Sequence, residues 1–140
     1  MLCQKTDLND NYLEELLAQE KQDYRFPTEE LKNIQRSGRK QFTSLYTYDS
    51  EVLQYWTEKQ VYISLGYILL SLATLEINST PMEGIETHVI DEAFNLREKG
   101  LKTSVIVTIG YSSENDFNTK LPKSKFPKSK LPKEKIFTEI

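Results

Sequence analysis

The amino-acid sequence predicts an α+β domain in which helices pack on a small partial sheet. Capped apolar stripes indicate helices in the first half, a nearly continuous apolar run at 61–75 indicates a buried helix, and a β-branched run at 101–109 indicates a strand. The 140 residues, 38% hydrophobic and 28% charged, suffice for one modest core. We therefore expect a single domain over residues 1–140, with a body at 1–119 and an arm at 120–140.

Helical signals fill the first half of the chain. Residues 8–22 carry an apolar stripe with helical spacing, and Asp10 is the candidate N-cap of this helix. Thr28 is the candidate N-cap of a second helix. Ser50 is expected to cap a third helix, whose second half, 61–75, should be the buried spine of the fold. The apolar residues of the second helix lie roughly on one side, at Leu31, Ile34, Phe42 and Leu45.

A turn is expected after that apolar run, at Thr80-Pro81-Met82-Glu83-Gly84-Ile85. Pro81 fixes its own φ angle, and Gly84, which has no Cβ, allows another group to approach the main chain closely. Such a turn either builds a ligand site or only changes the direction of the chain. Its own residues leave both interpretations open.

The rest of the body should supply a short helix and a central strand. Residues 87–96 have helical spacing with an inward face of Val89, Ile90 and Phe94, and Lys99-Gly100 forms a stop. The run at 101–109 is typical of a strand buried on both faces, and residues 1–6 can pair beside it. Two strands make a marginal sheet, so further strands should come from another chain or from an absent part of the domain.

Basic residues concentrate in the arm. Residues 1–119 carry 11 Lys or Arg and 19 Asp or Glu, whereas residues 120–140 carry 7 Lys and 2 Glu. The arm repeats the pentads LPKSK, FPKSK and LPKEK, and prolines at every fifth position predict an extended conformation whose lysines can reach a phosphate. Residues 136–140 alternate like a strand that adds to a sheet edge. No nucleic-acid partner is expected, because the acidic body would repel a polyanion.

The chain lacks the usual signals of membrane and secreted proteins. Its longest apolar run is shorter than the roughly 20 residues that a membrane span requires, and its start lacks the layout of a signal peptide. The single cysteine, Cys3, cannot form an internal disulfide, and the lone His88 is too far along the chain to activate it. We expect a cytoplasmic protein with no membrane partner, no metal site and no side-chain nucleophile.

Seven motifs occur in the chain in a characteristic order: Gly38-Arg-Lys-Gln-Phe42, Trp56-Thr-Glu-Lys-Gln-Val-Tyr62, Pro81-Met-Glu-Gly84, Leu96-Arg-Glu-Lys-Gly100, Gly110-Tyr-Ser-Ser, Asp116-Phe-Asn118 and Leu121-Pro-Lys-Ser-Lys125. In this order they resemble the flavin-dependent nitroreductases, most closely the oxygen-insensitive NAD(P)H nitroreductase and dihydropteridine reductase type. The resemblance covers essentially the whole chain. It implies an FMN-dependent homodimer in which the last strand of the arm crosses to the partner subunit.

The resemblance also implies roles for particular residues. In that family the turn matching Pro81, Met82, Glu83 and Gly84 lies along the isoalloxazine edge of FMN, where main-chain N–H groups at the last two positions serve flavin N5 and O4. The residue matching Phe42 shapes a substrate pocket over the flavin of the other subunit. The basic pair that holds the FMN phosphate matches either of two lysine pairs, because the extra pentad lets each serve: Lys123 with Lys125, or Lys128 with Lys130.

The implied activity is two-electron, ping-pong reduction of a small-molecule acceptor, a nitroaromatic, quinone or pteridine, at the expense of NAD(P)H. The family's N-terminal third, with its Arg-His-Ser phosphate-binding motif, has no counterpart in these 140 residues. Two hypotheses therefore stay open. One is a working oxidoreductase, and the other is a truncated, non-catalytic remnant or interaction module with weak or no flavin binding.

Overall fold

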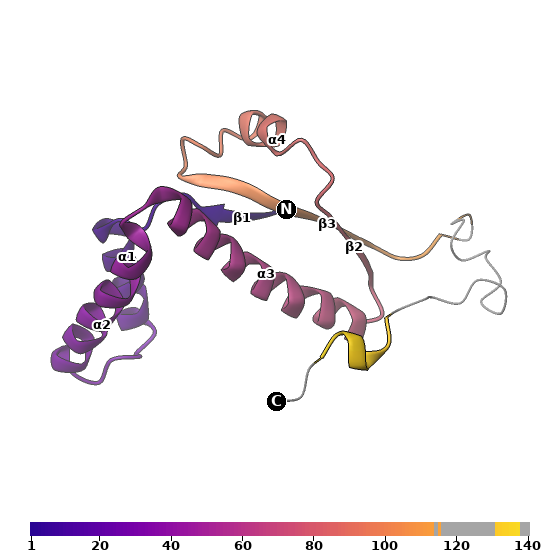
Figure 1. Ribbon diagram of the computed structural model, residues 1–140. Helices are drawn as coiled ribbons and strands as arrows, with labels where there is room; N and C mark the ends of the chain where they lie inside the picture. The colour runs from indigo at the N-terminus through magenta and orange to yellow at the C-terminus, as the bar shows by residue number, and fades with distance from the viewer. Residues whose placement is uncertain (114, 116–130, 138–140) are drawn as a thin grey trace. The chain divides into compact units, whose positions relative to one another are not determined.

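The computed structural model describes residues 1–113, 115 and 131–137 (Figure 1). The chain divides into two compact units, Met1–Ile109 and Gly110–Ile140. The first unit mixes helices with a small sheet, which confirms the predicted α+β class. In chain order the elements are β1 (Leu2–Lys5), α1 (Asp10–Gln22), α2 (Glu29–Thr47), α3 (Ser50–Thr74), β2 (Asn78–Met82), α4 (Thr87–Ala93), β3 (Leu101–Gly110) and the 3-10 helix η1 (Lys133–Lys135).

Helices α1 and α2 form a hairpin whose caps are close to those predicted. Thr28 caps α2, as expected, by accepting a hydrogen bond from the Leu31 N–H. Helix α1 is capped by Asn9, which accepts from the Tyr12 N–H, and the expected cap Asp10 is its first helical residue. The correction is small, because an acidic residue in the first turn still favours the helix dipole.

Ion pairs join α1 to α2. Arg39 Nη2 lies 2.9 and 3.0 Å from the two carboxylate oxygens of Glu20, and its hydrogen bond holds the pKa of Glu20 below the usual value. Lys40 Nζ lies 2.6 Å from an Asp10 oxygen. The cations of the predicted Gly38-Arg-Lys motif are therefore paired within the hairpin, which is a structural role and not that of a free phosphate ligand.

Helix α3 runs beside β1 and β2 (Figure 1). Its N-cap is Asp49, whose carboxylate accepts hydrogen bonds from the Glu51 and Val52 N–H groups. The predicted cap, Ser50, is instead the first residue of the helix. It ends in a six-to-one hydrogen bond of 2.9 Å from Ile77 N–H to Leu72 C=O, with Glu76 between them at φ 57°. This cap turns the chain directly into β2.

The second half of α3 is not the buried spine that its apolar sequence predicts. The buried residues of the helix are Leu53, Thr57 and Leu65, whereas Tyr67 is 71% exposed and Leu70 is 64% exposed. The physical reason is that the described residues cover one side of the helix only. Helix α2 likewise leaves its apolar side in solvent, with Leu31, Ile34, Phe42 and Leu45 between 47% and 60% exposed.

The sheet has three strands in the order β1-β3-β2 within the described residues. Strand β1 pairs antiparallel with β3, in the register Gln4 opposite Lys102, which confirms the predicted pairing of the two ends of the body. Thr103, Ser104 and Val105 are buried in succession, so this part of β3 is covered on both faces, as predicted. The prediction was wrong for the end of the run, where Ile109 is 57% exposed, because the described residues do not cover that end of the strand.

Strand β2 corrects the predicted turn. Thr80, Pro81 and Met82 belong to the strand, and only Glu83 and Gly84 follow it. Proline is tolerated because β2 is an edge strand, where one side of the backbone needs no hydrogen-bond partner. The pairing with β3 also supplies, within this chain, the third strand that a two-stranded sheet lacked.

Helix α4 lies on the opposite side of the sheet from α3 (Figure 1). It is shorter than predicted, and its expected inward residues Val89 and Phe94 are 49% and 56% exposed. The residue it buries is Asp91, which accepts the Thr103 N–H of β3 at 2.9 Å. A buried hydrogen bond therefore attaches α4 to the sheet where an apolar face was expected.

The second unit contains η1, a single 3-10 turn within the third pentad. Pro132, just before it, has the φ and ψ angles of polyproline II, −59° and 149°. The first two pentads and residues 138–140 lie outside the described residues, so the extended arm and its last strand stay predictions. No helix in the part of the chain that the structure describes combines the length and apolarity that a membrane span requires.

Candidate functional site

The end of β2 exposes unpaired main chain. Pro81 and Met82 are its last residues, and Glu83 and Gly84 are exposed beyond it. Within the described residues, the N–H groups of Glu83 and Gly84 donate to no backbone acceptor. A Cβ placed on Gly84 would meet no atom within 4 Å. Two adjacent amide donors without a backbone acceptor in the described residues therefore lie in exposed main chain, and such donors can bind the acceptor atoms of a ligand.

A side-chain contact holds this segment against α3. The Tyr62 hydroxyl donates a hydrogen bond to Glu83 Oε1 at a donor–acceptor distance of 2.7 Å. That bond raises the pKa of Tyr62 to about 12, with smaller contributions from burial and from the Glu83 and Glu58 charges. The hydroxyl thus stays protonated and fixes the Glu83 carboxylate, and with it the direction of the neighbouring amides.

We expect the Tyr62 hydroxyl to ionise only near pH 12, where its raised pKa lies. Tyrosinate absorbance should show a transition near pH 12 that the Tyr62→Phe variant lacks, and Glu83→Gln should move this transition toward the ordinary tyrosine value near 10. Because the folded-state pKa is raised, the stability that the bond contributes is present below about pH 10 and is lost as the pH rises through about 12. A high-pH transition unchanged in both variants would contradict the assignment.

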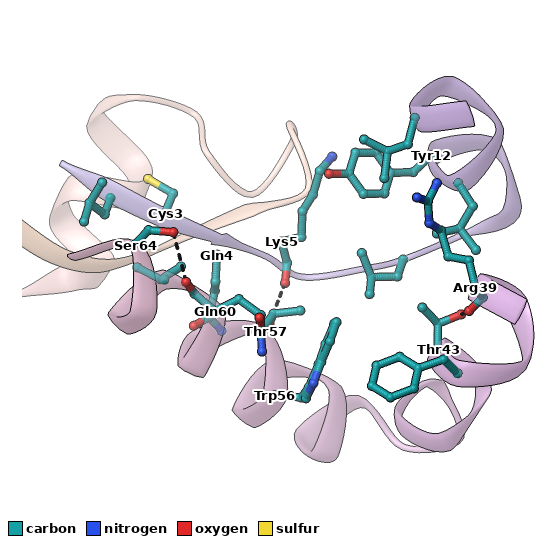
Figure 2. Close-up of a pocket in the computed structure, with 16 residues that line it drawn as sticks. Cys3, Gln4, Lys5, Tyr12, Arg39, Thr43, Trp56, Thr57, Gln60 and Ser64 are labelled. Carbon is teal, nitrogen blue, oxygen red and sulfur yellow. Dashed lines mark hydrogen bonds between the residues drawn. The ribbon is translucent and has the colours of Figure 1, made fainter. Parts of the chain in front are cut away.

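A separate cavity of about 500 Å³ lies between β1, α1, α2 and α3 (Figure 2). Its wall is mostly apolar and contains three aromatic side chains, Tyr12, Phe42 and Trp56. Trp56 stacks on Tyr46 with ring centroids 4.8 Å apart and planes 18° apart, and Phe42 meets both rings edge-on. The cluster forms one rigid aromatic side of the cavity.

The predicted site residues fall in two places. Phe42 lines the cavity and is 50% exposed, and its role in a substrate pocket stays a prediction. The residues of the β2 end, Pro81 to Gly84, are not among those that line it. The four predicted phosphate-binding lysines, Lys123, Lys125, Lys128 and Lys130, lie outside the described residues. Of the predicted residues that the structure describes, Phe42 lines the cavity and Pro81 to Gly84 do not.

Three contacts were not predicted from the sequence: the Tyr62–Glu83 bond, the Trp56–Tyr46 stack, and the position of Lys5 at the cavity. Tyr62 and Glu83 are 21 residues apart on a helix and a loop, and no local spacing relates them. Only the motif that runs from Trp56 to Tyr62 marked that part of α3 as a segment of interest.

Comparison with known proteins first gives the class: the homologues of this chain are NAD(P)H oxidoreductases. In particular, the chain is 38% identical over 124 residues to the oxygen-insensitive NAD(P)H nitroreductases of Enterobacter cloacae and Salmonella typhimurium. These alignments cover 89% of this chain and 57% of each relative. The chain is also 44% identical over 70 residues to the major NAD(P)H-flavin oxidoreductase of Aliivibrio fischeri, covering 49% of this chain and 32% of that protein.

The relatives confirm the resemblance to nitroreductases on which the sequence motifs converge. The chain is a homologue of the oxygen-insensitive NAD(P)H nitroreductases and spans 57% of their length. No protein-family model matches it.

Proposed function

We propose that this chain is part of an FMN-dependent NAD(P)H oxidoreductase that reduces nitroaromatics, quinones or pteridines. The observation that carries the proposal is the pair of N–H groups at Glu83 and Gly84, which have no backbone acceptor in the described part of the chain and lie at an accessible stretch of main chain after β2. Flavin presents acceptor atoms along one edge of a flat ring, so these donors fit it. The names of the relatives add support, since they include nitroreductases and a flavin oxidoreductase.

When bound, a flavin would supply the two-electron redox chemistry that links NAD(P)H to the acceptor. The role of the chain is to position and stabilise. The Glu83 and Gly84 amides donate toward the ring edge where negative charge accumulates, and an amide N–H does so without becoming reduced itself. Tyr62 keeps that segment in place through Glu83. The arm lysines, Lys123 with Lys125 or Lys128 with Lys130, would hold the phosphate as point charges.

The proposal includes a homodimer in the cytoplasm. Phe42 lies away from the β2 end in its own chain. To shape a substrate pocket over a flavin, the Phe42 face of one subunit would therefore have to lie against the flavin of the other subunit. The exposed apolar sides of α2 and α3 offer a surface for such a contact. Exchange of the C-terminal arm between subunits belongs to the same proposal.

The second candidate is a non-catalytic interaction module. It is favoured by the limited coverage of the relatives, 57% of their length, because a partial domain holds fewer of the groups that bind a flavin. The same exposed apolar sides would then bind another protein.

One preparation separates the two candidates. We expect the purified full chain to become yellow after incubation with FMN and removal of free FMN, to elute as a dimer, and to oxidise NADPH when a nitrofuran is added. A colourless protein that oxidises no NADPH would overturn the oxidoreductase proposal for this chain. A yellow protein active in the nitrofuran assay would overturn the interaction module.

A further inference from the structure

We propose that the cavity between β1, α1, α2 and α3 binds a planar aromatic ring that carries a carboxylate, with the Lys5 ammonium group as the partner of that carboxylate. The cavity is not lined by the Glu83 and Gly84 main chain that is assigned to the flavin edge, although its Phe42 is also the residue assigned to the partner subunit's flavin. The proposal goes beyond the oxidoreductase function because it concerns a carboxylate-bearing ligand that binds without a flavin.

The size and wall of the cavity select a small aromatic ligand. Its volume of about 500 Å³ is in the range of small-molecule sites, roughly 300 to 1,000 Å³. Phe42 and Trp56 line it from α2 and α3, and Tyr12 lines it from α1. Because the rings come from three different helices, they can contact a flat ligand on more than one side.

The charged residues that line the cavity favour an anionic ligand. Lys5 and Arg39 are the charged residues in its lining, and no carboxylate accompanies them there. Arg39 Nη2 holds both oxygens of Glu20, a carboxylate that Arg25 also contacts at 3.2 Å, and Arg39 Nη1 is buried with no hydrogen-bond partner in the described residues. Lys5 forms no ion pair within the described residues, and its Nζ lies over the Tyr12 ring, 4.3 Å from the ring centroid. Lys5 is therefore the cation of the lining without a carboxylate partner among the described residues, which fits a ligand that carries one carboxylate.

The backbone of Lys5 is held in place. Its carbonyl oxygen accepts a hydrogen bond from Thr57 Oγ1 on α3 at 3.0 Å, and Figure 2 shows the Lys5 side chain extending toward Tyr12. The β1 ladder fixes the same residue from the other side, opposite Leu101. An ammonium group on so constrained a backbone loses less entropy on binding an anion than one on a free loop.

The test compares two probes of nearly the same shape. Naphthalene-2-carboxylate and naphthalene-2-carboxamide are titrated by calorimetry into the full chain without FMN or NAD(P)H, and the fluorescence of Trp56, the single tryptophan, reports occupancy. We expect the carboxylate to bind about tenfold more tightly than the carboxamide, because only the carboxylate gains a charge-assisted hydrogen bond. Equal affinities, or no change in Trp56 fluorescence on binding, would overturn the proposal.

Two variants and one control assign the preference to Lys5. Lys5→Gln should remove the preference for the carboxylate, whereas Lys5→Arg should keep it. Lys59→Gln is the matched control, because Lys59 also lies over a tyrosine ring, Tyr55 at 4.0 Å, but does not line the cavity. A preference that survives in Lys5→Gln, or that Lys59→Gln also removes, would show that the anion does not pair with Lys5. Since no flavin is present, failure here and failure of the oxidoreductase proposal are distinguishable.

Discussion

Replacing Asp91 by alanine is expected to lower the free energy of unfolding by about 3 kcal/mol. The Asp91 residue is 2% exposed, accepts the buried Thr103 N–H at 2.9 Å, and places Oδ2 at 2.9 Å from Arg97 Nε. Alanine would leave the Thr103 amide without its acceptor and would remove the group that attaches α4 to β3. An unsatisfied buried donor is costly, because it has lost its hydrogen bonds to water as well.

Urea unfolding followed by circular dichroism measures this effect. Arg97→Ala is the matched control, since the Arg97 side chain is 55% exposed and its partner would keep the Thr103 hydrogen bond. We expect that control to cost less than Asp91→Ala, because the Thr103 amide keeps its acceptor, although the buried Asp91 carboxylate loses its cation. If Asp91→Ala unfolds at the same urea concentration as the unmodified chain, the Asp91–Thr103 contact does not stabilise the fold.

The same contact predicts a sensitivity to acid. Burial raises the pKa of Asp91, but the hydrogen bonds from Thr103 and the charge and hydrogen bond of Arg97 together lower it further, so the pKa lies below the ordinary 3.8. A carboxylate with a depressed folded-state pKa contributes stability above the unfolded-state value, and this contribution is lost as the pH falls through the folded-state value. The unmodified chain should have a higher free energy of unfolding than Asp91→Asn at neutral pH, and this difference should decrease below about pH 4.

Replacing Glu83 by proline is expected to slow flavin reduction by NAD(P)H about a hundredfold, if the chain acts as proposed. Proline removes the N–H group assigned to the flavin edge, and the strand conformation of Met82 before it is compatible with a following proline. No backbone acceptor in the described residues depends on that N–H group, so the loss falls on the ligand.

Stopped-flow kinetics on FMN-loaded protein measures this rate, and the FMN dissociation constant is determined separately for each variant. Glu83→Gln is the control, because it keeps the main-chain donor while it removes the side-chain charge. We expect a change of less than about tenfold for the control. Equal losses in both variants would assign the effect to the carboxylate, and an unchanged rate in Glu83→Pro would remove the amide from the mechanism.

Local sequence signals predicted a large part of the fold. The caps at or beside Asp10, Thr28 and Ser50 placed the starts of α1, α2 and α3 within one residue, because a capping side chain acts on amides only two or three positions away. The β-branched run at 101–109 predicted β3, and residues 1–6 were correctly expected beside it. Both are cases in which the information lies within a few neighbouring residues.

The candidate site was predicted less completely. Phe42 lines a cavity, but its role in a substrate pocket stays a prediction. Of the predicted turn, Thr80 to Met82 belong to an edge strand of the described sheet, and the chain turns only at Glu83 to Ile85. Whether Pro81-Met-Glu-Gly84 contacts a flavin, and which lysine pair holds its phosphate, stay predictions. Such contacts need groups that lie elsewhere in the assembly, so the residues of the motif cannot specify them alone.

The helices, the central strand, the acidic body with its basic arm and the kinship with nitroreductases can all be read from the order of the residues. The packing of the chain was needed to show that Thr80 to Met82 join the sheet, that Asp91 and not an apolar face attaches α4, and that one side of α3 stays exposed. It also decided that Tyr62 holds Glu83 and that Lys5 lies at an aromatic cavity. The reason is that the apolar or charged nature of a side chain shows that it needs a partner, whereas the partner itself comes from residues far along the chain.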